Sequence, residues 1–324
     1  MLATVAACSQ SPQTPTTPTA TSGSIAATPP GNTTPPDTPP ETPPATPTPT
    51  PPPPPPGAPP GNPTTGQTVT VVAVGDIGMC GSAGVQQAAR LAESIDGQIL
   101  LAGDLAYMQG SMADFLRCFD PYWGQFRRRW RPAPGNHEYD TAGAAGYFQY
   151  FGESAGGGGR TYYSFRTGDW LVLMLDSNIA TRTGSPQYEF VRNELVVSRT
   201  PCTLAVWHHP LFSSGPNGPN VFMRDLWGLL YDNGADVVVA GHDHFYERFG
   251  KQDVDGRSDP RGLRQFIAGT GGATLYDFQR MSANSQARVK AHGVLKLTLS
   301  PSSYQWAFLE ASGAISDSGT DGCH

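Results

Sequence analysis

The 324-residue sequence lacks several features that mark particular classes of protein. It has no run of about 18 apolar residues, which a helix needs to cross a bilayer. Its net charge is −6, so it lacks the broad positive field that gathers nucleic acid or anionic lipid. None of its five cysteines forms a CxxC pair, which disfavours a zinc knuckle or a redox motif. We therefore expect neither nucleic acid nor a lipid surface as the main partner.

The first 66 residues lack lysine and arginine, and they hold 22 of the 32 prolines. Residues 9–66 are rich in Pro and Thr and include six consecutive prolines, Pro51–Pro56. Such a segment favours extended polyproline II and cannot build a core, so we expect a disordered tether. Residues 67–324 have ordinary apolar content and are long enough for one sizeable domain, which we expect to carry the catalytic function.

Residues 1–8 end in Val5-Ala6-Ala7-Cys8, which resembles the end of a bacterial lipoprotein signal, whose cysteine is acylated after cleavage. We expect Cys8 to be the lipidation site of an exported chain in the cell envelope or outside the cell. A lipid anchor would then be the only membrane contact. The alternative is a chance cysteine followed by a tail without function.

The other four cysteines are Cys80, Cys118, Cys202 and Cys323. An even number in an exported chain suggests two disulfides, and four cysteines allow three pairings. We favour Cys80 with Cys118, because both follow early strands that should be neighbours, which leaves Cys202 for Cys323.

Apolar, β-branched runs of strand length recur through residues 67–324, and we expect strands at 68–74, 98–102, 131–133, 170–175, 203–207, 236–240, 263–268, 294–299 and 304–309. Stretches with helical periodicity lie at 83–95, 111–119, 186–197 and 221–231. The early order alternates strand and helix, and the late order is mostly strands. Because several runs are apolar on both faces, the pattern predicts an α/β fold with mixed sheets covered by helices.

Polar residues follow the expected strands at five places, as Gly75-Asp76-Ile77-Gly78, Gly103-Asp104-Leu105-Ala106-Tyr107, Gly135-Asn136-His137-Glu138, His208-His209-Pro210 and Gly241-His242-Asp243-His244. The carboxyl ends of strands in open α/β sheets face the ligand crevice, so we expect these side chains to converge. The glycines would let the backbone turn sharply at each strand end. His242 and His244 would project to one side of an extended chain.

Each motif alone has an ordinary explanation, since a Gly-Asp after a strand is usually a turn and paired histidines are often surface residues. Five such motifs in order, each at the end of an expected strand, are hard to explain as independent turns and surface residues. The set therefore predicts a metal site at one rim of the sheets.

Taken together, the five motifs resemble those of the calcineurin-like metallophosphoesterases. Tyr107 and the Tyr246-Glu247-Arg248 tail look like the purple acid phosphatase branch, here of bacterial type. The resemblance covers roughly residues 69–272. It implies a four-layer α/β/β/α sandwich of two mixed sheets, with a dinuclear metal centre at one edge.

The resemblance also implies the metal ligands. One ion would bind Asp76, Asp104, Tyr107 and His244, and the other Asp104, Asn136, His208 and His242. A phenol ligates at neutral pH only beside a strongly Lewis-acidic ion, so Tyr107 predicts Fe(III), while the second position suits Zn, Mn or Fe(II). A core tyrosine that faces away from the metals is the alternative for Tyr107.

The implied activity is hydrolysis of a small-molecule phosphate monoester by metal-activated hydroxide, with His137 as general acid. We expect His209 to contact phosphate or to support a ligand, Asp243 to orient an imidazole, and Glu247 to form an ion pair with Arg248. A phosphodiesterase or nucleotidase on the same centre is one alternative. A tethered cell-surface binding protein with a structural metal site is another. The sequence leaves the physiological substrate and the oligomeric state open.

Overall fold

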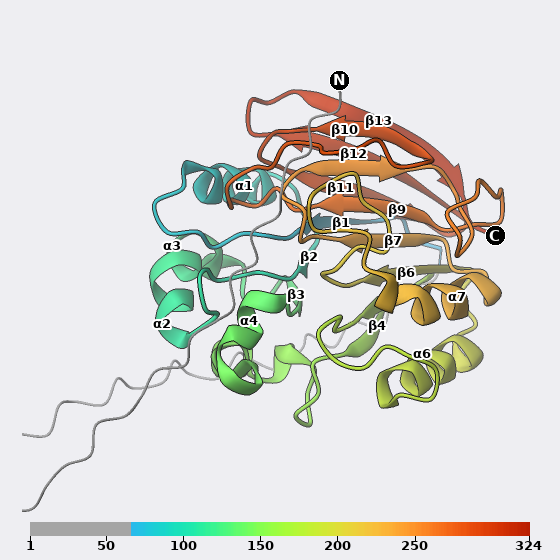
Figure 1. Ribbon diagram of the computed structural model, residues 1–324, viewed down its shortest axis with the longest axis horizontal. Coiled ribbons are helices and arrows are strands. Elements are labelled where there is room, and N and C mark those ends of the chain that lie inside the picture. The colour runs from blue at the N-terminus through green and yellow to red at the C-terminus, as the bar shows by residue number, and fades with distance from the viewer. Residues whose placement is uncertain (1–65) are drawn as a thin grey trace, which may run out of the picture. The chain divides into compact units, whose positions relative to one another are not determined.

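The computed structural model describes residues 66–324, which form two β-sheets between two groups of helices (Figure 1). The expected lipidation site Cys8 and residues 9–65 of the expected tether lie outside the described residues. Among residues 66–324, no helix combines the length and the apolar character needed to cross a membrane.

The first sheet has six strands in the order β13-β12-β11-β1-β2-β3. Their bounds are β1 (Val69–Val74), β2 (Gln98–Ala102), β3 (Trp130–Ala133), β11 (Gly293–Ser300), β12 (Ser303–Glu310) and β13 (Ile315–Gly322). Strands β1, β2 and β3 are parallel neighbours, whereas the pairings of β1 with β11, β11 with β12 and β12 with β13 are antiparallel, so the sheet is mixed.

The second sheet has seven strands in the order β10-β8-β9-β7-β6-β5-β4. Their bounds are β4 (Tyr163–Thr167), β5 (Trp170–Met174), β6 (Cys202–Val206), β7 (Val237–Ala240), β8 (Tyr246–Phe249), β9 (Arg264–Ala268) and β10 (Ser285–Val289). The central strands β5, β6, β7 and β9 pair in parallel, and the flanking pairs are antiparallel. This sheet is therefore mixed as well.

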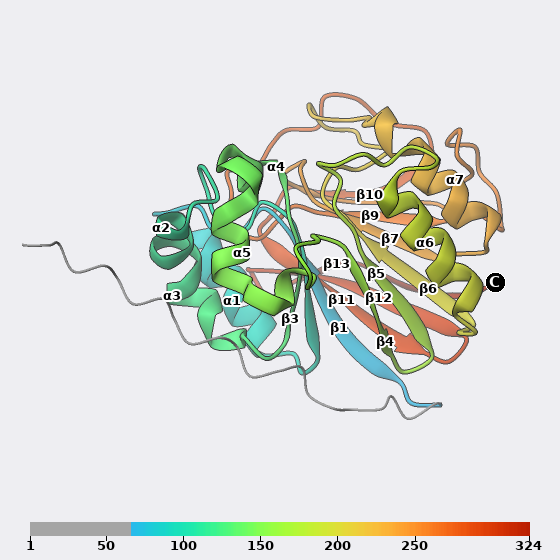
Figure 2. The same ribbon diagram turned by 90° about the horizontal axis from the view of Figure 1, so that it is seen from below.

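Helices lie on the outer side of each sheet, as Figure 2 shows. On the side of the first sheet are α1 (Ala83–Glu93), α2 (Met112–Asp114), α3 (Asp120–Trp123), α4 (Asn136–Asp140) and α5 (Ala145–Phe151), with a π-helical turn at Phe115–Phe119. On the side of the second sheet are α6 (Pro186–Val197) and α7 (Arg224–Asp232), the latter preceded by the 3₁₀ turn η5 (Val221–Met223).

Successive strand residues alternate between two apolar cores, as the period of two in a β-strand requires. In β1, Val71 packs into the core between the two sheets and Val72 packs against the helices of the first sheet. In β7, Val239 faces the core between the sheets and Val238 faces α7 and its neighbours. These strands are buried on both faces, and the α/β/β/α sandwich expected from the family resemblance is confirmed.

Two disulfides join Cys80 to Cys118 and Cys202 to Cys323, with Cα–Cα distances of 4.7 Å and 5.6 Å. Cys80 follows β1, and Cys118 follows the neighbouring parallel strand β2, which is the adjacency that the sequence suggests. Both favoured pairings are confirmed.

Candidate metal centre

Three strand ends of the first sheet and two of the second meet at one rim of the sandwich. Asp76 follows β1, Asp104 follows β2, Asn136 follows β3, His208 follows β6, and His242 follows β7. Contacts between the sheets hold these ends together, since the His242 N–H donates to Asp76 Oδ2 at 2.8 Å. The Nδ1 atom of His208 likewise lies 2.8 Å from the carbonyl oxygen of Ala102 at the end of β2.

The backbone is strained where it carries these side chains. Asp76, Asp104 and His242 have φ of 58°, 52° and 72°, in the left-handed region that residues other than glycine rarely enter. Such strain is typical of functional sites, where the surrounding structure enforces it. The expectation that His242 and His244 lie on extended chain is wrong, because His242 turns the chain before β8 begins.

The glycines of the motifs provide close approach more than they provide turns. A Cβ atom at Gly135 would lie 2.1 Å from Asp104 Oδ1, and one at Gly241 would lie 2.5 Å from Asp76 Oδ2. Of the glycines that directly precede the candidate ligands, only Gly103 has a positive φ, at 82°. Any side chain at Gly135 or Gly241 would push into the space where the carboxylates of the neighbouring motif lie.

One group of candidate ligand atoms surrounds His208. Its Nδ1 faces the Ala102 carbonyl, which only accepts, so Nδ1 carries a hydrogen, and Nε2 is the atom that can offer a lone pair to a metal once it is deprotonated. That Nε2 lies 3.2 Å from Asp104 Oδ2, 3.2 Å from Asn136 Oδ1 and 3.2 Å from His242 Nδ1. Four atoms that can each donate an electron pair therefore converge on one point.

A second group surrounds His244, whose Nδ1 is fixed in the same way by the carbonyl of Thr274 at 2.7 Å. Its Nε2 lies 3.2 Å from Asp76 Oδ1 and 3.1 Å from the Tyr107 hydroxyl. The Tyr107 hydroxyl also lies 3.0 Å from Asp76 Oδ1 and 3.3 Å from Asp104 Oδ2. Tyr107 thus faces the other candidate ligands rather than pointing away, and Asp104 contacts both groups.

The electrostatics of this site favour positive charge on His208 and oppose it on His242. Burial opposes ionisation of His208, but the Asp104 carboxylate overcomes it and raises the pKa of His208 to about 10. Burial and the neighbouring His208 lower the pKa of His242 to about 3. The residues fit metal ions, because carboxylate, imidazole, amide and phenol groups converge here. The Nδ1 atoms of His208 and His244 are held on carbonyls, as the second nitrogen of metal-binding histidines usually is.

His137 and His209 flank the seven candidate ligands. His137 Nδ1 lies 2.5 Å from the Met108 carbonyl and 3.3 Å from Asp140 Oδ2, and its Nε2 points toward Asp104 Oδ2 at 3.9 Å. His209 Nδ1 lies 2.7 Å from Ser177 Oγ, and its ring centroid is 4.3 Å from that of His242. Burial, followed by the charge of His208, lowers the pKa of His209 to about 3, so its imidazole is neutral.

Glu138 belongs to the third motif, but the sequence assigned it no role. It is fully buried, and its carboxylate accepts hydrogen bonds from the backbone N–H groups of Asp104, Leu105, Ala106 and Gly135. Burial and the Asp104 carboxylate raise the pKa of Glu138 to about 7, against the effect of these hydrogen bonds. Glu138 therefore anchors the loop that presents Asp104.

Two expectations outside the ligand set are wrong. The Asp243 carboxylate accepts hydrogen bonds from Ser213 and from Asn217 N, and it contacts no imidazole among the described residues. Glu247 accepts from Ser214 N at 2.9 Å and makes no ion pair with Arg248. The Arg248 guanidinium instead contacts Asp317 at 2.7 Å, because neighbouring residues of β8 point to opposite faces of the sheet.

A family model described as calcineurin-like phosphoesterase matches residues 69–246, a span that contains all seven candidate ligands. The chain belongs to this family. The description of the family names its members as phosphoesterases.

Several curated relatives of this family member come from a plant. Purple acid phosphatase 15 of Arabidopsis thaliana is 27% identical over 62% of this chain and 44% of its own length. Purple acid phosphatase 18 of the same plant is 31% identical over 53% of this chain and 43% of its own length. The chain thus spans less than half the length of these relatives.

Among solved structures, a purple acid phosphatase from yellow lupin (Lupinus luteus) seeds shares the fold, with a TM-score of 0.69. The match covers 80% of this chain and 54% of the lupin chain at 21% sequence identity.

Proposed function

We propose that residues 67–324 form a metal-dependent phosphatase that hydrolyses small-molecule phosphate monoesters at a centre of two metal ions. The observation that carries this proposal is the position of Asp104, which contacts two separate groups of electron-pair donors. His208 Nε2 marks the first group and His244 Nε2 marks the second. Asp104 Oδ2 makes the contacts to both groups, while Oδ1 accepts from His137 N. A carboxylate in this position would suit the bridge between two metals, which lie about 3.5–4 Å apart in such centres.

In this proposal, Asp76, Asp104, Tyr107 and His244 hold one ion, and Asp104, Asn136, His208 and His242 hold the other. The phenol of Tyr107 suits Fe(III), and the amide and imidazole ligands suit Zn, Mn or Fe(II). When bound, the two ions neutralise phosphate oxygens and supply a hydroxide at neutral pH.

His137 is placed to protonate the leaving oxygen of the ester. The Met108 carbonyl and the Asp140 carboxylate hold its Nδ1–H, which leaves Nε2 directed toward the centre. In the reaction, His137 Nε2 gives its proton to the departing alkoxide. Ser177 holds His209 beside His242, where His209 helps to position the phosphate or the neighbouring ligand.

The two disulfides support an exported protein as part of this proposal. Both are of the kind that forms and persists outside the cytosol. The proposed lipid anchor at Cys8 would add only attachment to a membrane.

The substitution Asp104→Asn tests the centre, because an amide removes the charge and one oxygen ligand from the bridge. We expect the variant to lose metal content by elemental analysis and to lose turnover of phosphate monoesters. Asp232→Asn, at the exposed end of α7, is the matched control and should retain both. Normal turnover by Asp104→Asn would exclude the bridging role.

The substitution His137→Gln tests the proton donor with a series of esters whose leaving groups differ in pKa. General acids contribute about 10²–10⁴-fold to rate, and the loss should be largest for poor leaving groups. A loss of equal size across the series would make His137 a positioning residue.

A panel of monoesters and diesters separates the alternatives. Preferential cleavage of diesters would favour a phosphodiesterase on the same centre. A wild-type protein that binds two ions and cleaves neither class would favour the binding protein with a structural metal site.

A further inference from the structure

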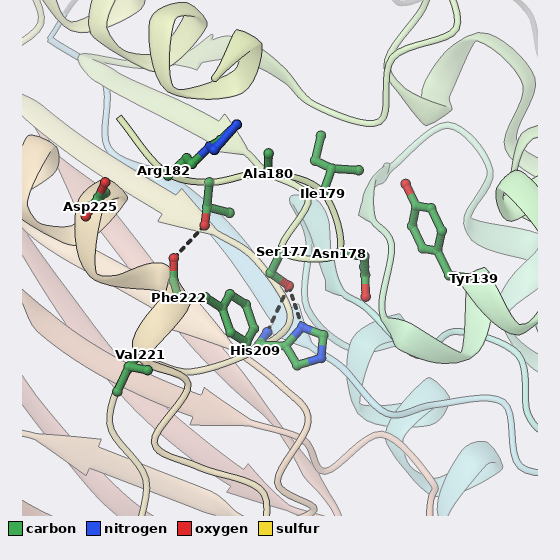
Figure 3. Close-up of a pocket in the computed structure, with 11 residues that line it drawn as sticks. Tyr139, Ser177, Asn178, Ile179, Ala180, Arg182, His209, Val221, Phe222 and Asp225 are labelled. Atoms are coloured by element: carbon green, nitrogen blue, oxygen red, sulfur yellow. Dashed lines mark hydrogen bonds between the residues drawn. The ribbon is translucent and has the colours of Figure 1, made fainter. Parts of the chain in front are cut away.

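A cleft of about 700 Å³ opens beside the candidate metal centre (Figure 3). His209 lies at its inner end, with its ring centroid 4.3 Å from that of His242. A molecule whose phosphate lies at the metal centre would therefore extend directly into this cleft. The cleft is much larger than a phosphate group, and the proposed mechanism uses only its inner end.

The cleft is lined by polar and apolar side chains, and the charged side chains of Arg182 and Asp225 line it as well. Ser177 and Asn178 line it together with His209, whereas Ile179, Val221 and Phe222 provide an apolar wall. Val221 and Phe222 are 68% and 47% exposed, although both are large apolar side chains. Figure 3 shows the Phe222 ring beside His209, with the ring centroids 5.5 Å apart. Apolar surface of this kind next to a reaction centre marks a ligand-binding groove.

Hydrogen bonds hold the two sides of the cleft in place. Thr181 Oγ1 donates to the Phe222 carbonyl at 2.5 Å, and Thr183 donates to Asp225 through its N–H at 2.7 Å and its hydroxyl at 2.9 Å. The chain between β5 and α6 is therefore tied to η5 and the start of α7.

The floor near the centre is fixed as well. Buried Asp176 accepts hydrogen bonds from the Tyr139 hydroxyl at 2.5 Å and from Asn178 Nδ2 at 2.9 Å. Tyr139 and Asn178 both line the cleft. The cleft is thus preformed, which lowers the entropy that a bound group must lose.

We propose that this cleft binds the organic group of the phosphate ester, and that Phe222 favours esters whose organic group contains a planar aromatic ring. This inference rests on the proposed phosphatase function. The size of the cleft suits a ring, Phe222 offers an aromatic face, and Ile179 and Val221 add apolar contact. Ser177 and Asn178 offer hydrogen bonds to polar atoms between the ring and the phosphate. Aryl phosphates and nucleoside monophosphates share this chemistry.

The substitution Phe222→Ala tests the proposal with phenyl phosphate, adenosine 5′-monophosphate and glycerol 2-phosphate as substrates. We expect the ratio of kcat/KM for an aromatic ester to that for glycerol 2-phosphate to fall about fivefold to tenfold, the effect of losing one aromatic contact. Phe222→Trp should restore the ratio. Tyr122→Ala removes an aromatic side chain that is 37% exposed on α3, on the side of the first sheet, and should leave the ratio unchanged.

The two aromatic substrates distinguish the source of the ring. A fall for phenyl phosphate alone assigns the cleft to aryl esters, a fall for adenosine 5′-monophosphate alone assigns it to nucleotides, and both results support the proposal. An unchanged ratio for both, in a folded variant, would overturn it.

Calorimetric binding of phenylphosphonate and methylphosphonate to the metal-loaded protein separates this inference from the proposed function. We expect the wild type to prefer phenylphosphonate and Phe222→Ala to lose that preference. A wild type that prefers phenylphosphonate but hydrolyses no ester contradicts the phosphatase function and supports the cleft. A wild type that hydrolyses esters without any preference for the aromatic phosphonate overturns the proposal about the cleft and leaves the phosphatase function standing.

Discussion

Replacing Glu138 by glutamine should reveal how strongly the metal loop depends on one buried carboxylate. Glu138 Oε2 accepts from Asp104 N at 3.0 Å and from Gly135 N at 2.7 Å, and Oε1 accepts from Leu105 N at 2.8 Å and from Ala106 N at 3.2 Å. Glutamine keeps the shape but replaces one oxygen by an NH₂ group. In either orientation of the amide, two backbone N–H groups then face a donor instead of an acceptor.

The size of the effect follows from those two lost hydrogen bonds. A hydrogen bond to a charged group contributes about 1.5–3 kcal/mol, so the two lost bonds cost about 3–6 kcal/mol at pH 8, where the carboxylate is ionised. Relief of the buried charge and of its repulsion by Asp104, which raise the pKa of Glu138, offsets part of this cost, so the free energy of unfolding should fall by less than that sum. The sum itself is a large part of the roughly 5–15 kcal/mol that stabilises a typical domain. The Asp104 N–H is one of the four donors, so the affinity for metal should also fall, by about 10–100-fold.

Urea unfolding measures the first quantity, and metal content after dialysis measures the second. Glu93→Gln, on the exposed face of α1, is the matched control and should stay within about 0.5 kcal/mol of the wild type. A Glu138→Gln variant with wild-type stability and metal content would refute the reasoning. Reduced stability with normal metal affinity would show that Glu138 supports the fold without positioning Asp104.

Two further substitutions test other parts of the molecule. Tyr107→Phe should remove a visible charge-transfer band from the metal-loaded protein, and a colourless, active, iron-free wild type would contradict Fe(III). Asp317→Asn should lower stability at pH 7 by about 3 kcal/mol in urea unfolding, because Asp317 accepts from Tyr246, Arg248 and Trp306. Burial alone would raise the pKa of Asp317, but the hydrogen bonds from Arg248 and Tyr246 outweigh burial and lower it. Its contribution is thus present above the unfolded pKa of about 3.9 and is lost as pH falls through the lower native pKa. A difference from wild type that persists below that pKa would contradict this linkage.

The sequence predicts best those elements whose local chemistry and burial agree. Strand β2 (Gln98–Ala102) and helix α6 (Pro186–Val197) have the predicted bounds. The strand is a short apolar run that is buried on both faces. The helix begins at Pro186, directly after Ser185, whose side chain accepts from Tyr188 N.

Three of the four strands at sheet edges were missed because they bury little, whereas the edge strand β3 was predicted; the inner strand β8 was missed although it is mostly buried. Strands β13, β10 and β4 lie at edges of the two sheets. Residues of β13 alternate between exposed and half-buried, and its Ser, Asp, Thr and Gly residues carry no apolar run. These strands form because they pair with neighbouring strands of the sheet, and a single sequence does not show those pairings.

The candidate site was predictable in its members but not in its geometry. The order of motifs at strand ends identified the side chains that meet at the rim. The left-handed backbone at Asp76, Asp104 and His242 depends on tertiary contacts, and so does the buried role of Glu138. The prediction that Glu247 pairs with Arg248 was wrong because it rested on proximity in sequence. Neighbouring residues of a strand point to opposite faces of the sheet.

The division of the candidate ligands between two sheets has a mechanical consequence. Asp76, Asp104 and Asn136 follow strands of the first sheet, whereas His208 and His242 follow strands of the second. Ions bound between them would cross-link the two sheets. They would add about 2.7 kcal/mol to the free energy of unfolding when the free metal concentration is a hundred times the dissociation constant. Sliding one layer past the other would then release the ions and end turnover in the same event.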